Sequence, residues 1–298
     1  MTDNDNNAPR KAQRAPLAYE NKKFLDSPDG RVLRILSEYQ EPLSRFRRER
    51  IQDTIVFFGS ARFHSRSDAE EALVLLDKPG SVNPAPPDEQ ELVSRARSDI
   101  EMARYYEDAR ELAFMLTKWT KTISQARHRF VVCTGGGPGI MEAANRGAFE
   151  AGGKSIGMNI NLPFEQMPNR YVTPELNFEF HYFFMRKLWF AYLAKALVVF
   201  PGGFGTFDEL FELLTLAQTE KLAKRICVVI YGSEYWHRVV NFEALVEAGT
   251  ISPRDLDLFN FADSPQEAFD YLRRHLELHH LDQHNHHERE PEIAKTRP

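Results

Sequence analysis

The chain has 298 residues, of which 42% are hydrophobic and 27% are charged, as in ordinary globular proteins. Its formal net charge of −5 argues against the basic surface that nucleic-acid-binding proteins need. No apolar run is long enough to cross a bilayer, and the N-terminus is polar rather than signal-like. We therefore expect a cytoplasmic protein without a nucleic-acid or membrane partner.

The N-terminal part of the chain predicts a tail followed by a helix. Residues 1–24 are polar and show no periodicity, which predicts disorder. Ser27 and Pro28 are typical of a helix start, and the apolar positions that follow extend that helix toward Arg50. We expect residues 25–278 to form a single domain.

The first buried strand is predicted at residues 54–58 and ends in a turn of small residues, Gly59 and Ser60. A helical insertion is expected over residues 64–124. It comprises a short helix at 67–76, a proline-rich loop at 79–87 and a long helix from Asp88. Apolar residues at helical spacing in the long helix favour core or dimer contacts over a cofactor site.

A second strand, at residues 130–134, leads into a glycine turn and a helix at 140–148; the turn contains Gly135, Gly136 and Gly137. One such turn can either bind a ligand or simply pack a helix on a strand. It matches neither the Walker A pattern nor a good dinucleotide fingerprint. Cys133, just before the turn, is more simply a small core residue than a catalytic thiol.

Two further strands are predicted at residues 154–160 and 178–183. They precede a helix at 185–194 that begins with Met185, Arg186 and Lys187. Arg186 can bind an anion or make a structural ion pair. His181 has the pattern of a core histidine rather than of a base.

A third strand–glycine–helix unit follows the apolar run at 196–200; its turn and first helical residues include Gly202, Gly203, Gly205, Thr206 and Glu209. Glycines let the backbone approach a ligand, and a helix N-terminus offers N–H groups and a positive dipole end to a phosphate. Thr206 can cap the helix or donate its hydroxyl to the anion. Glu209, one turn later, is either a reactive carboxylate or a simple partner of the helix dipole.

The chain ends with a strand at 225–231 and helices at 236–247 and 264–278. Apolar strands alternate with amphipathic helices, which predicts a Rossmann-like, doubly wound α/β fold with a mostly parallel sheet and helices on both faces. Ligands bind beyond the carboxyl ends of such strands, where the glycine turns collect. Residues 279–298 are histidine-rich, and we interpret them as a flexible tail without a metal site.

The two main glycine turns resemble the LOG ("lonely guy") family, also described as possible lysine decarboxylases. That family carries a PGGxGTxxE motif, which residues 201–209 match at every defined position. The family's GGGxxGxM turn resembles residues 135–141, with the last glycine one place early. Its Met-Arg-Lys segment resembles residues 185–187, and its Gly-Ser turn resembles residues 59–60. The resemblance covers roughly residues 52–250.

The resemblance implies hydrolysis of the N-glycosidic bond of a nucleoside 5′-monophosphate, either AMP-like or a cytokinin riboside monophosphate, without a cofactor. Glu209 and Arg186 would be catalytic. The substrate-binding residues would be Gly202, Gly203, Gly205, Thr206, Gly135, Gly136, Gly137, Gly59, Ser60, Met185 and Lys187. It also implies a homodimer or larger homo-oligomer. The insertion and the N-terminal helix resemble the longer bacterial members, some of which act on general nucleoside monophosphates.

Two other functions compete with hydrolysis. A non-catalytic nucleotide carrier, like the related molybdenum-cofactor carriers, would bind tightly and release no product. A decarboxylase would need a lysine to form a Schiff base with pyridoxal phosphate. Lys187, Lys195 and Lys221 are available, but none has a recognisable cofactor context.

Overall fold

The computed structural model describes residues 14–76, 87–123, 126–162, 167–221 and 225–281. The chain divides into two compact units, Met1–Glu41 and Pro42–Pro298, and each is treated by itself. The division falls inside helix α2 (Arg31–Arg48), which contains Pro42. The larger unit holds the whole sheet and the glycine turns that the sequence predicts.

Short helical segments dominate the smaller unit. They are the 3₁₀ turn Ala18–Glu20, helix α1 (Lys22–Leu25) and the 3₁₀ turn Pro28–Gly30. The Asn21 side chain caps α1 by accepting a hydrogen bond from the Phe24 N–H at 3.3 Å. The first two segments fall within the stretch that we expected to be disordered, of which residues 1–13 lie outside the described residues.

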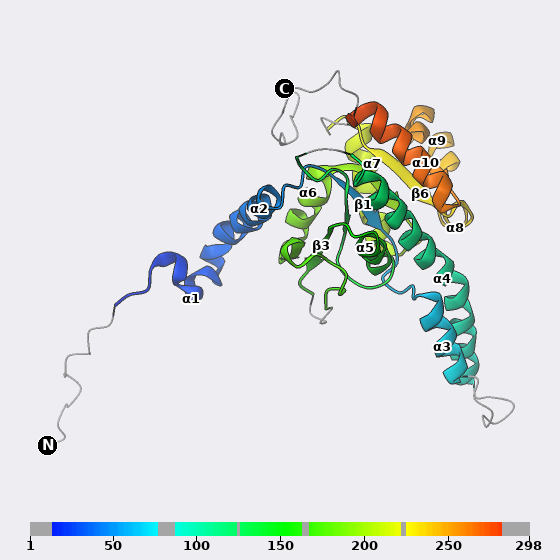
Figure 1. Ribbon diagram of the computed structural model, residues 1–298, viewed down its shortest axis with the longest axis horizontal. Helices are drawn as coiled ribbons and strands as arrows, with labels where there is room; N and C mark the ends of the chain where they lie inside the picture. The colour runs from blue at the N-terminus through cyan, green and yellow to red at the C-terminus, as the bar shows by residue number, and fades with distance from the viewer. Residues whose placement is uncertain (1–13, 77–86, 124–125, 163–166, 222–224, 282–298) are drawn as a thin grey trace. The chain divides into compact units, whose positions relative to one another are not determined.

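The larger unit contains a seven-stranded sheet in the order β4-β3-β2-β1-β5-β6-β7, in which every pairing is parallel (Figure 1). The strands are β1 (Thr54–Phe58), β2 (Val131–Thr134), β3 (Ser155–Ile160), β4 (Asn177–Phe180), β5 (Ala194–Val199), β6 (Cys227–Tyr231) and β7 (Asn260–Ala262). The chain builds outward from β1 to β4 and then returns to the centre at β5. This order confirms the predicted doubly wound α/β fold.

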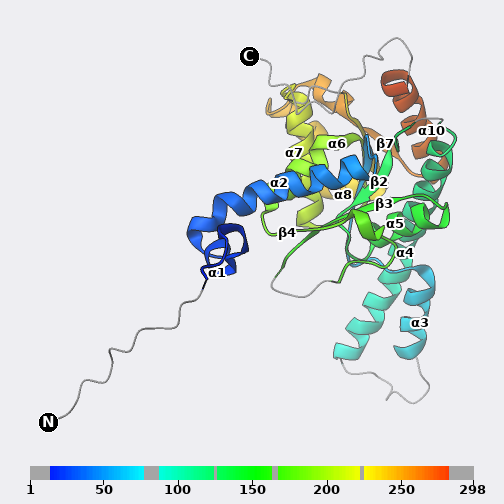
Figure 2. The same cartoon turned by 60° about the vertical axis from the view of Figure 1, so that its left-hand side comes forward.

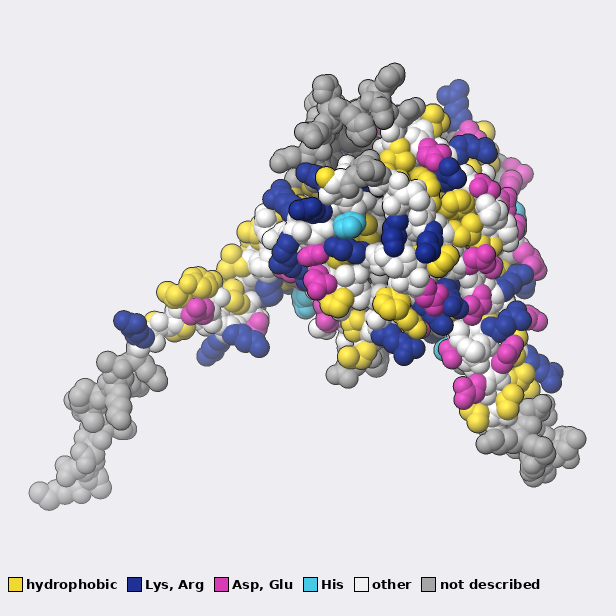
Figure 3. Space-filling model, in the orientation of Figure 1, with side chains coloured by type: hydrophobic (Ala, Val, Ile, Leu, Met, Phe, Trp, Pro, Cys, Tyr) yellow, Lys and Arg dark blue, Asp and Glu magenta, His cyan; other side chains and the backbone are white. Residues whose placement is uncertain are grey.

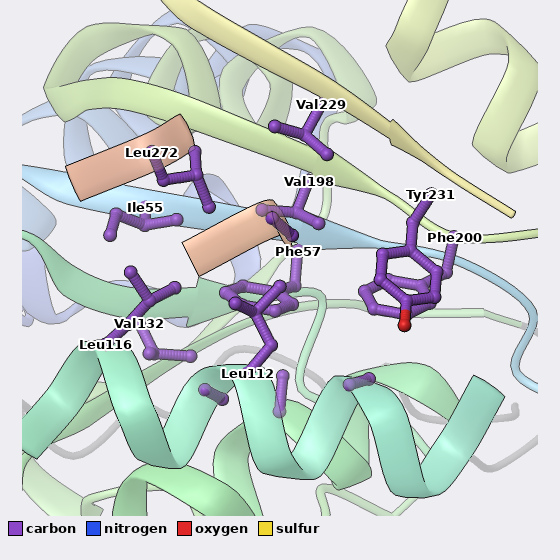
Figure 4. Close-up of a cluster of buried hydrophobic side chains, with 14 of the residues drawn as sticks. Ile55, Phe57, Leu112, Leu116, Val132, Val198, Phe200, Val229, Tyr231 and Leu272 are labelled. Atoms are coloured by element: carbon purple, nitrogen blue, oxygen red, sulfur yellow. The ribbon is translucent and has the colours of Figure 1, made fainter. Parts of the chain in front are cut away.

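One face of the sheet is covered by helices α4 (Pro87–Thr120), α5 (Ile140–Glu150) and α10 (Pro265–Leu276). Leu112 and Leu116 of α4 point at the strands, and Leu272 of α10 packs beside them (Figure 4). Tyr231 stacks on Phe200 with ring centroids 4.4 Å apart at the end of this layer. Burial of these apolar side chains is the main stabilising term of the fold.

Helices α6 (Phe183–Leu193) and α7 (Phe204–Gln218) cover the other face, as the turned view in Figure 2 shows. Phe190 of α6 meets Phe58 of β1 edge to face at 4.9 Å. Trp189 of α6 is fully buried and lies 5.4 Å from Phe46, near the C-terminal end of α2. With both faces covered, the strands read as continuous apolar runs, which is why they could be recognised in the sequence.

The segment expected as an insertion contains helix α3 (Arg66–Leu76) and α4. The C-terminal half of α4 is also the crossover helix between β1 and β2, since Leu112 and Leu116 are fully buried against the sheet. Therefore only the segment that precedes the C-terminal half of α4 is additional to an ordinary β–α–β unit. The predicted proline-rich loop lies outside the described residues except for Pro87, which begins α4.

One predicted helix is wrong, and one strand was not predicted. The single helix expected at 236–247 is two helices, α8 (Ser233–Val239) and α9 (Phe242–Glu247). Asn241 breaks it because its side chain accepts the Ala244 N–H at 3.0 Å and so caps α9. The edge strand β7 was missed, since its three residues are too few to show a period.

After α10 the chain forms a π-helical turn, Glu277–Leu281, which includes the first residues of the predicted histidine-rich tail. The rest of that tail, 282–298, lies outside the described residues. Among the described residues, no group of histidine, cysteine and acidic side chains could hold a metal ion. None of the helices described is long and apolar enough to span a membrane.

Acidic and basic side chains are interspersed along α4 on the face drawn in Figure 3. The same mixture is visible in the ion pairs of Arg110 with Glu107 at 3.3 Å and with Glu150 at 2.7 Å. A mixed surface of this kind does not produce the one-signed field that attracts a polyanion.

A buried ion pair lies at the amino-terminal ends of the central strands β1 and β2. Arg129 donates from Nε to the Asp53 carboxylate at 2.6 Å, and the Phe130 N–H donates to the other oxygen of Asp53 at 2.6 Å. Both side chains are almost completely buried, at 4% and 1% exposure. Arg129 also donates to the His280 carbonyl at 3.0 Å, which ties the C-terminal turn to the same pair.

We predict that Arg129→Met lowers the free energy of unfolding by about 3 to 5 kcal/mol, because it leaves the Asp53 carboxylate buried without its cation. Guanidinium denaturation of the full chain measures the change. Arg254→Met at an exposed position is the matched control and should change stability by less than about 0.5 kcal/mol. Equal effects of the two substitutions would show that the buried pair has no special weight.

Candidate active site

The predicted site residues gather at the carboxyl ends of three neighbouring strands. Gly59 and Ser60 follow β1, Gly135–Gly137 follow β2, and Gly202–Thr206 follow β5. Strand β1 lies between the other two, and the strand order reverses between β1 and β5. Ligands of doubly wound sheets bind at such a reversal, because the helices on either side of it leave in opposite directions.

The three turns contact one another through their backbones. The Ser60 N–H donates to the Pro201 carbonyl at 2.9 Å, and the Ile140 N–H donates to the Ser60 carbonyl at 3.0 Å. A Cβ at Gly59 would overlap the Ile140 side chain, and one at Gly139, whose φ is +71°, would overlap the Ser60 carbonyl. These two glycines serve loop packing, so the role of Gly59 is to let the turns approach.

Helix α7 begins at the third turn with open N–H groups. Its N-cap is Gly203, and no side chain caps it. A Cβ at Gly203 or at Gly205 would meet nothing within 4 Å, so the chain leaves free space beside these positions. An uncapped helix N-terminus with room in front of it is suited to an anion such as a phosphate.

Thr206 does not cap α7, which corrects one of its two predicted roles. It lies inside the first turn, 7% exposed, and its hydroxyl occupies the place that a Cβ at Gly202 would need. A glycine is thus required at position 202, because a Cβ there would overlap Thr206 and would lie 3.0 Å from the Ser60 nitrogen. Thr206 keeps the second predicted role, as a hydroxyl next to the open N–H groups.

Tyr235 of α8 also holds this turn and was not predicted. Its hydroxyl donates to the Gly202 carbonyl at 2.7 Å. A lone tyrosine early in a helix has no sequence signal for such a contact, since its partner is a backbone atom of a distant turn.

Three side chains hold the turn after β2, and the sequence analysis missed all of them. The Asn169 amide donates to the carbonyls of Gly136 and Gly137 at 3.0 and 2.9 Å, and to the Asn145 side chain at 2.9 Å. The Thr134 hydroxyl accepts the Gly136 N–H at 2.9 Å and donates to Asn145 at 2.7 Å. Asn145 and Thr134 are fully buried. Buried polar residues at the ends of a strand and on its helix were the available signal.

Arg186 on α6 is buried and faces the turn after β2. One of its terminal nitrogens would lie 2.8 Å from a Cβ at Gly135, so the missing side chain makes room for the guanidinium. Its Nε is buried without a hydrogen-bond partner, and it forms no ion pair with the residues that the structure describes. Burial lowers the pKa of Arg186, and the nearby Glu209 opposes that shift. The alternative of a structural ion pair is therefore not supported.

Glu209 lies in the second turn of α7 and is 8% exposed. Burial raises the pKa of Glu209 to about 7, against the favourable charges of Arg186 and Lys187. The loss of hydration thus changes this pKa more than the attraction of the two cations does, and the carboxyl titrates near neutral pH. A carboxyl group with so high a pKa beside a buried guanidinium is typical of a functional site.

The two neighbours of Arg186 lie differently from their predicted roles. The Lys187 ammonium contacts Asp208 at 2.8 Å and Glu212 at 2.5 Å, both on α7. Met185 is 5% exposed and packs in the interior. Substrate contact by either residue stays a prediction.

The environments of the other candidate groups do not favour reactive roles. Cys133 is fully buried, and burial raises its pKa far above the ordinary range, which disfavours a thiolate. Lys195 is the second residue of β5, near the amino-terminal end of that strand, and Lys221 follows α7. His181 is exposed and lies after β4 rather than within it. With Lys187 engaged by two acids, no lysine among the described residues is placed for a Schiff base at these turns.

The glycines of the α7 turn provide a matched pair of substitutions. We predict that Gly202→Ala destabilises the protein by about 1 to 3 kcal/mol, because the new methyl group overlaps Thr206. Gly205→Ala should preserve or raise stability by about 0.5 to 1 kcal/mol, since it stiffens the helix without a clash.

If the expected nucleotide binds at this turn, Gly205→Ala should nevertheless weaken the binding of AMP, because the methyl group would enter the space in front of the N–H groups. Thermal unfolding and calorimetric titration measure the two effects. Unchanged AMP affinity of Gly205→Ala would place the phosphate elsewhere.

Glu209 gives a pH-dependent prediction. Its folded pKa of about 7 is above the usual value, so the folded state binds the extra proton and loses stability as pH rises toward 7. Glu209→Gln removes this cost and should raise the free energy of unfolding by about 2 to 3 kcal/mol at pH 8, with little change at pH 4. Denaturation at both pH values tests it; a gain of equal size at both would refute the assignment.

Comparisons with known proteins show the family to which the chain is similar. The family model described as possible lysine decarboxylase matches residues 141–272. The cytokinin riboside 5′-monophosphate phosphoribohydrolase LOG1 of Arabidopsis thaliana is 30% identical over 158 residues, which cover 50% of this chain and 72% of that protein. The corresponding enzyme of Rhodococcoides fascians is 31% identical over 137 residues, or 45% of this chain and 67% of that protein.

Among solved structures, the molybdenum cofactor binding protein from Rippkaea orientalis aligns with 74% of this chain and 96% of its own, at 16% identity and a TM-score of 0.42. That similarity is too low to bear on function. The two sequence relatives match this chain at 30% identity or more over at least two thirds of their own length. The chain therefore belongs to the LOG family, whose family model is described as possible lysine decarboxylase.

Proposed function

We propose that the protein is a nucleoside 5′-monophosphate phosphoribohydrolase, which hydrolyses the N-glycosidic bond to release a free base and ribose 5-phosphate. The observation that carries the proposal is the pairing of a buried carboxyl, Glu209, with the buried guanidinium of Arg186, which has no ion-pair partner in the described part of the chain, beside the open N-terminus of α7. The names of the relatives from Arabidopsis and Rhodococcoides support the same reaction.

The phosphate would bind the N–H groups of the first turn of α7, in the space beside Gly203 and Gly205. Thr206 would add its hydroxyl. A 5′-phosphate held there anchors the nucleotide at a site that is rigid, since the turn is fixed by Ser60 and by Tyr235. Anchoring by the phosphate predicts that unphosphorylated nucleosides are poor substrates.

Glu209 would act on the ribose. In its ionised form it can accept hydrogen bonds from the ribose hydroxyls and stabilise the positive charge that develops as the C1′–N bond breaks. A water molecule then forms the new C1′–O bond, and a proton passes to the departing base. Arg186 would hold the phosphate or assist the leaving base, because its buried guanidinium needs an anion or an acceptor.

Base preference belongs to the same proposal. The relatives act, by name, on cytokinin riboside monophosphates, whereas the extra N-terminal helix and the α3–α4 segment resemble longer bacterial members. We propose a general AMP-like substrate, with Met185, Gly136 and Gly137 near the base. Lys187 as a direct substrate ligand is the weakest of the predicted contacts, given its ion pairs with Asp208 and Glu212.

We also propose that the chain forms a homo-oligomer and works in the cytoplasm. Phe183 and Phe184 of α6 and Phe204 of α7 are 54%, 55% and 97% exposed beside the site, which is unusual for large apolar side chains unless they are covered by a partner. The cysteines Cys133 and Cys227 are free thiols, as is typical of a reducing compartment.

A chromatographic assay with AMP, GMP, CMP, UMP, IMP and isopentenyl-AMP, each beside its nucleoside, tests the function. We expect base release from monophosphates alone, and a loss of at least about a hundredfold in Glu209→Gln with the fold retained. Glu243→Gln, at an exposed position of α9, is the control and should behave as the wild type. Tight AMP binding with no base released would instead identify a carrier.

A further inference from the structure

Helix α7 carries three acidic side chains within two turns, Asp208, Glu209 and Glu212. Glu209 is buried, whereas the side chains of Asp208 and Glu212 are 59% and 37% exposed. Residues three and four apart on a helix are neighbours on its surface, so Glu212 lies next to both of the others. The arrangement places two negative charges beside the carboxyl that the proposed reaction uses.

Lys187 of α6 contacts both flanking acids. Its ammonium lies 2.8 Å from the Asp208 carboxylate and 2.5 Å from the Glu212 carboxylate, and only 19% of its side chain is exposed. The pKa of Lys187 is raised by these two partners although its burial opposes the shift. The ammonium is therefore fully charged, and both of its acidic partners are on α7.

The contacts of Lys187 join α6, which carries the Arg186 guanidinium, to α7, which carries the Glu209 carboxyl. Arg186 precedes Lys187 on α6, and Glu209 lies between Asp208 and Glu212 on α7. A short two-point contact from Lys187 restrains the separation of the two helices, and with it the distance between guanidinium and carboxyl. Held geometry of this kind is what a reactive pair requires.

The charged groups that act on Glu209 are the cations Arg186 and Lys187 and the anions Glu212 and Asp208. Cys133, which also faces Arg186, is neutral because burial raises its pKa. The two cations and two anions balance, so the removal of one cation leaves an excess of negative charge beside Glu209. A like charge at this range disfavours the ionised carboxyl.

We propose that Lys187 is a positioning residue, which neutralises Asp208 and Glu212 and joins α6 to α7 so that Glu209 is ionised beside Arg186, and that it does not bind the substrate. The inference rests on the proposed function. It differs from the role that the family resemblance implied for Lys187, in which the lysine contacts the substrate directly.

The two roles predict different kinetics. If Lys187 binds the substrate, Lys187→Met raises KM at every pH and leaves the acidic limb of the pH–rate profile in place. If it neutralises the acids, Lys187→Met moves that limb upward by about one pH unit, since one nearby charge typically shifts a pKa by that amount. Activity at pH 6 then falls about tenfold and recovers at pH 9, with KM little changed.

The experiment is a pH profile of kcat and KM for AMP hydrolysis from pH 5 to 9. Lys187→Arg, which keeps the charge, should keep the wild-type limb. The charge-compensated variant Lys187→Met/Asp208→Asn/Glu212→Gln should return the limb to the wild-type pH or below it, because the anions are removed together with the cation. A limb that stays raised in this triple variant would overturn the proposal.

A second measurement needs no turnover and serves if Lys187→Met folds poorly or if AMP is not a substrate. The Glu209 carboxyl is titrated by NMR in protein labelled with ¹³C-glutamate, with Glu209→Gln to assign its signal. Asp208→Asn/Glu212→Gln should lower the midpoint of this titration, and Lys187→Met should raise it. Unmoved midpoints in both would overturn the proposal, whereas absent base release with shifted midpoints would refute only the phosphoribohydrolase function.

Discussion

The backbone junction between the turns after β1 and β5 is the constraint on which the site depends. The Ser60 N–H bonds to the Pro201 carbonyl at 2.9 Å, and a Cβ at Gly202 would lie 3.0 Å from the Ser60 nitrogen, so the chain can approach this closely because Gly202 lacks a side chain. This contact lies where the strand order reverses, and it directs the N-terminus of α7 toward the turn after β2. The phosphate-binding geometry that we propose is thus a consequence of how the two halves of the sheet meet.

The site is built at a cost to stability. A carboxyl in the interior loses hydration, and two nearby cations do not fully offset that loss, so the pKa of Glu209 rises to about 7. The Nε of Arg186 is likewise buried without an acceptor. The buried ion pair of Asp53 with Arg129 differs from this, since each of the two side chains has the other as its partner. It lies at the amino-terminal ends of the strands. The unsatisfied guanidinium nitrogen and the carboxyl of raised pKa lie together at the carboxyl ends of the strands, as is typical of a functional site.

Most of the fold and the outline of the site could be predicted from sequence, because both depend on local patterns. Buried parallel strands are continuous apolar runs, and the three glycine turns each follow one of them. Asn169 and Tyr235 could not be predicted, since they bond to backbone carbonyls of turns that are distant in the chain. The break at Asn241 was missed because a capping side chain competes with an otherwise helical pattern. Substrate contact by Lys187, which its motif predicts, stays a prediction, since the contacts that the structure shows for it are with Asp208 and Glu212 on α7.

The central claim is that one end of a nucleotide is held by α7 while Glu209 faces its glycosidic carbon. A crystal structure of the Glu209→Gln variant with AMP tests this most directly, because the variant should bind the nucleotide without cleaving it. We expect the phosphate on the N–H groups beside Gly203 and Gly205, and the ribose C1′ between Arg186 and the amide that replaces the Glu209 carboxyl. A phosphate bound elsewhere, or a C1′ remote from both side chains, would contradict the account.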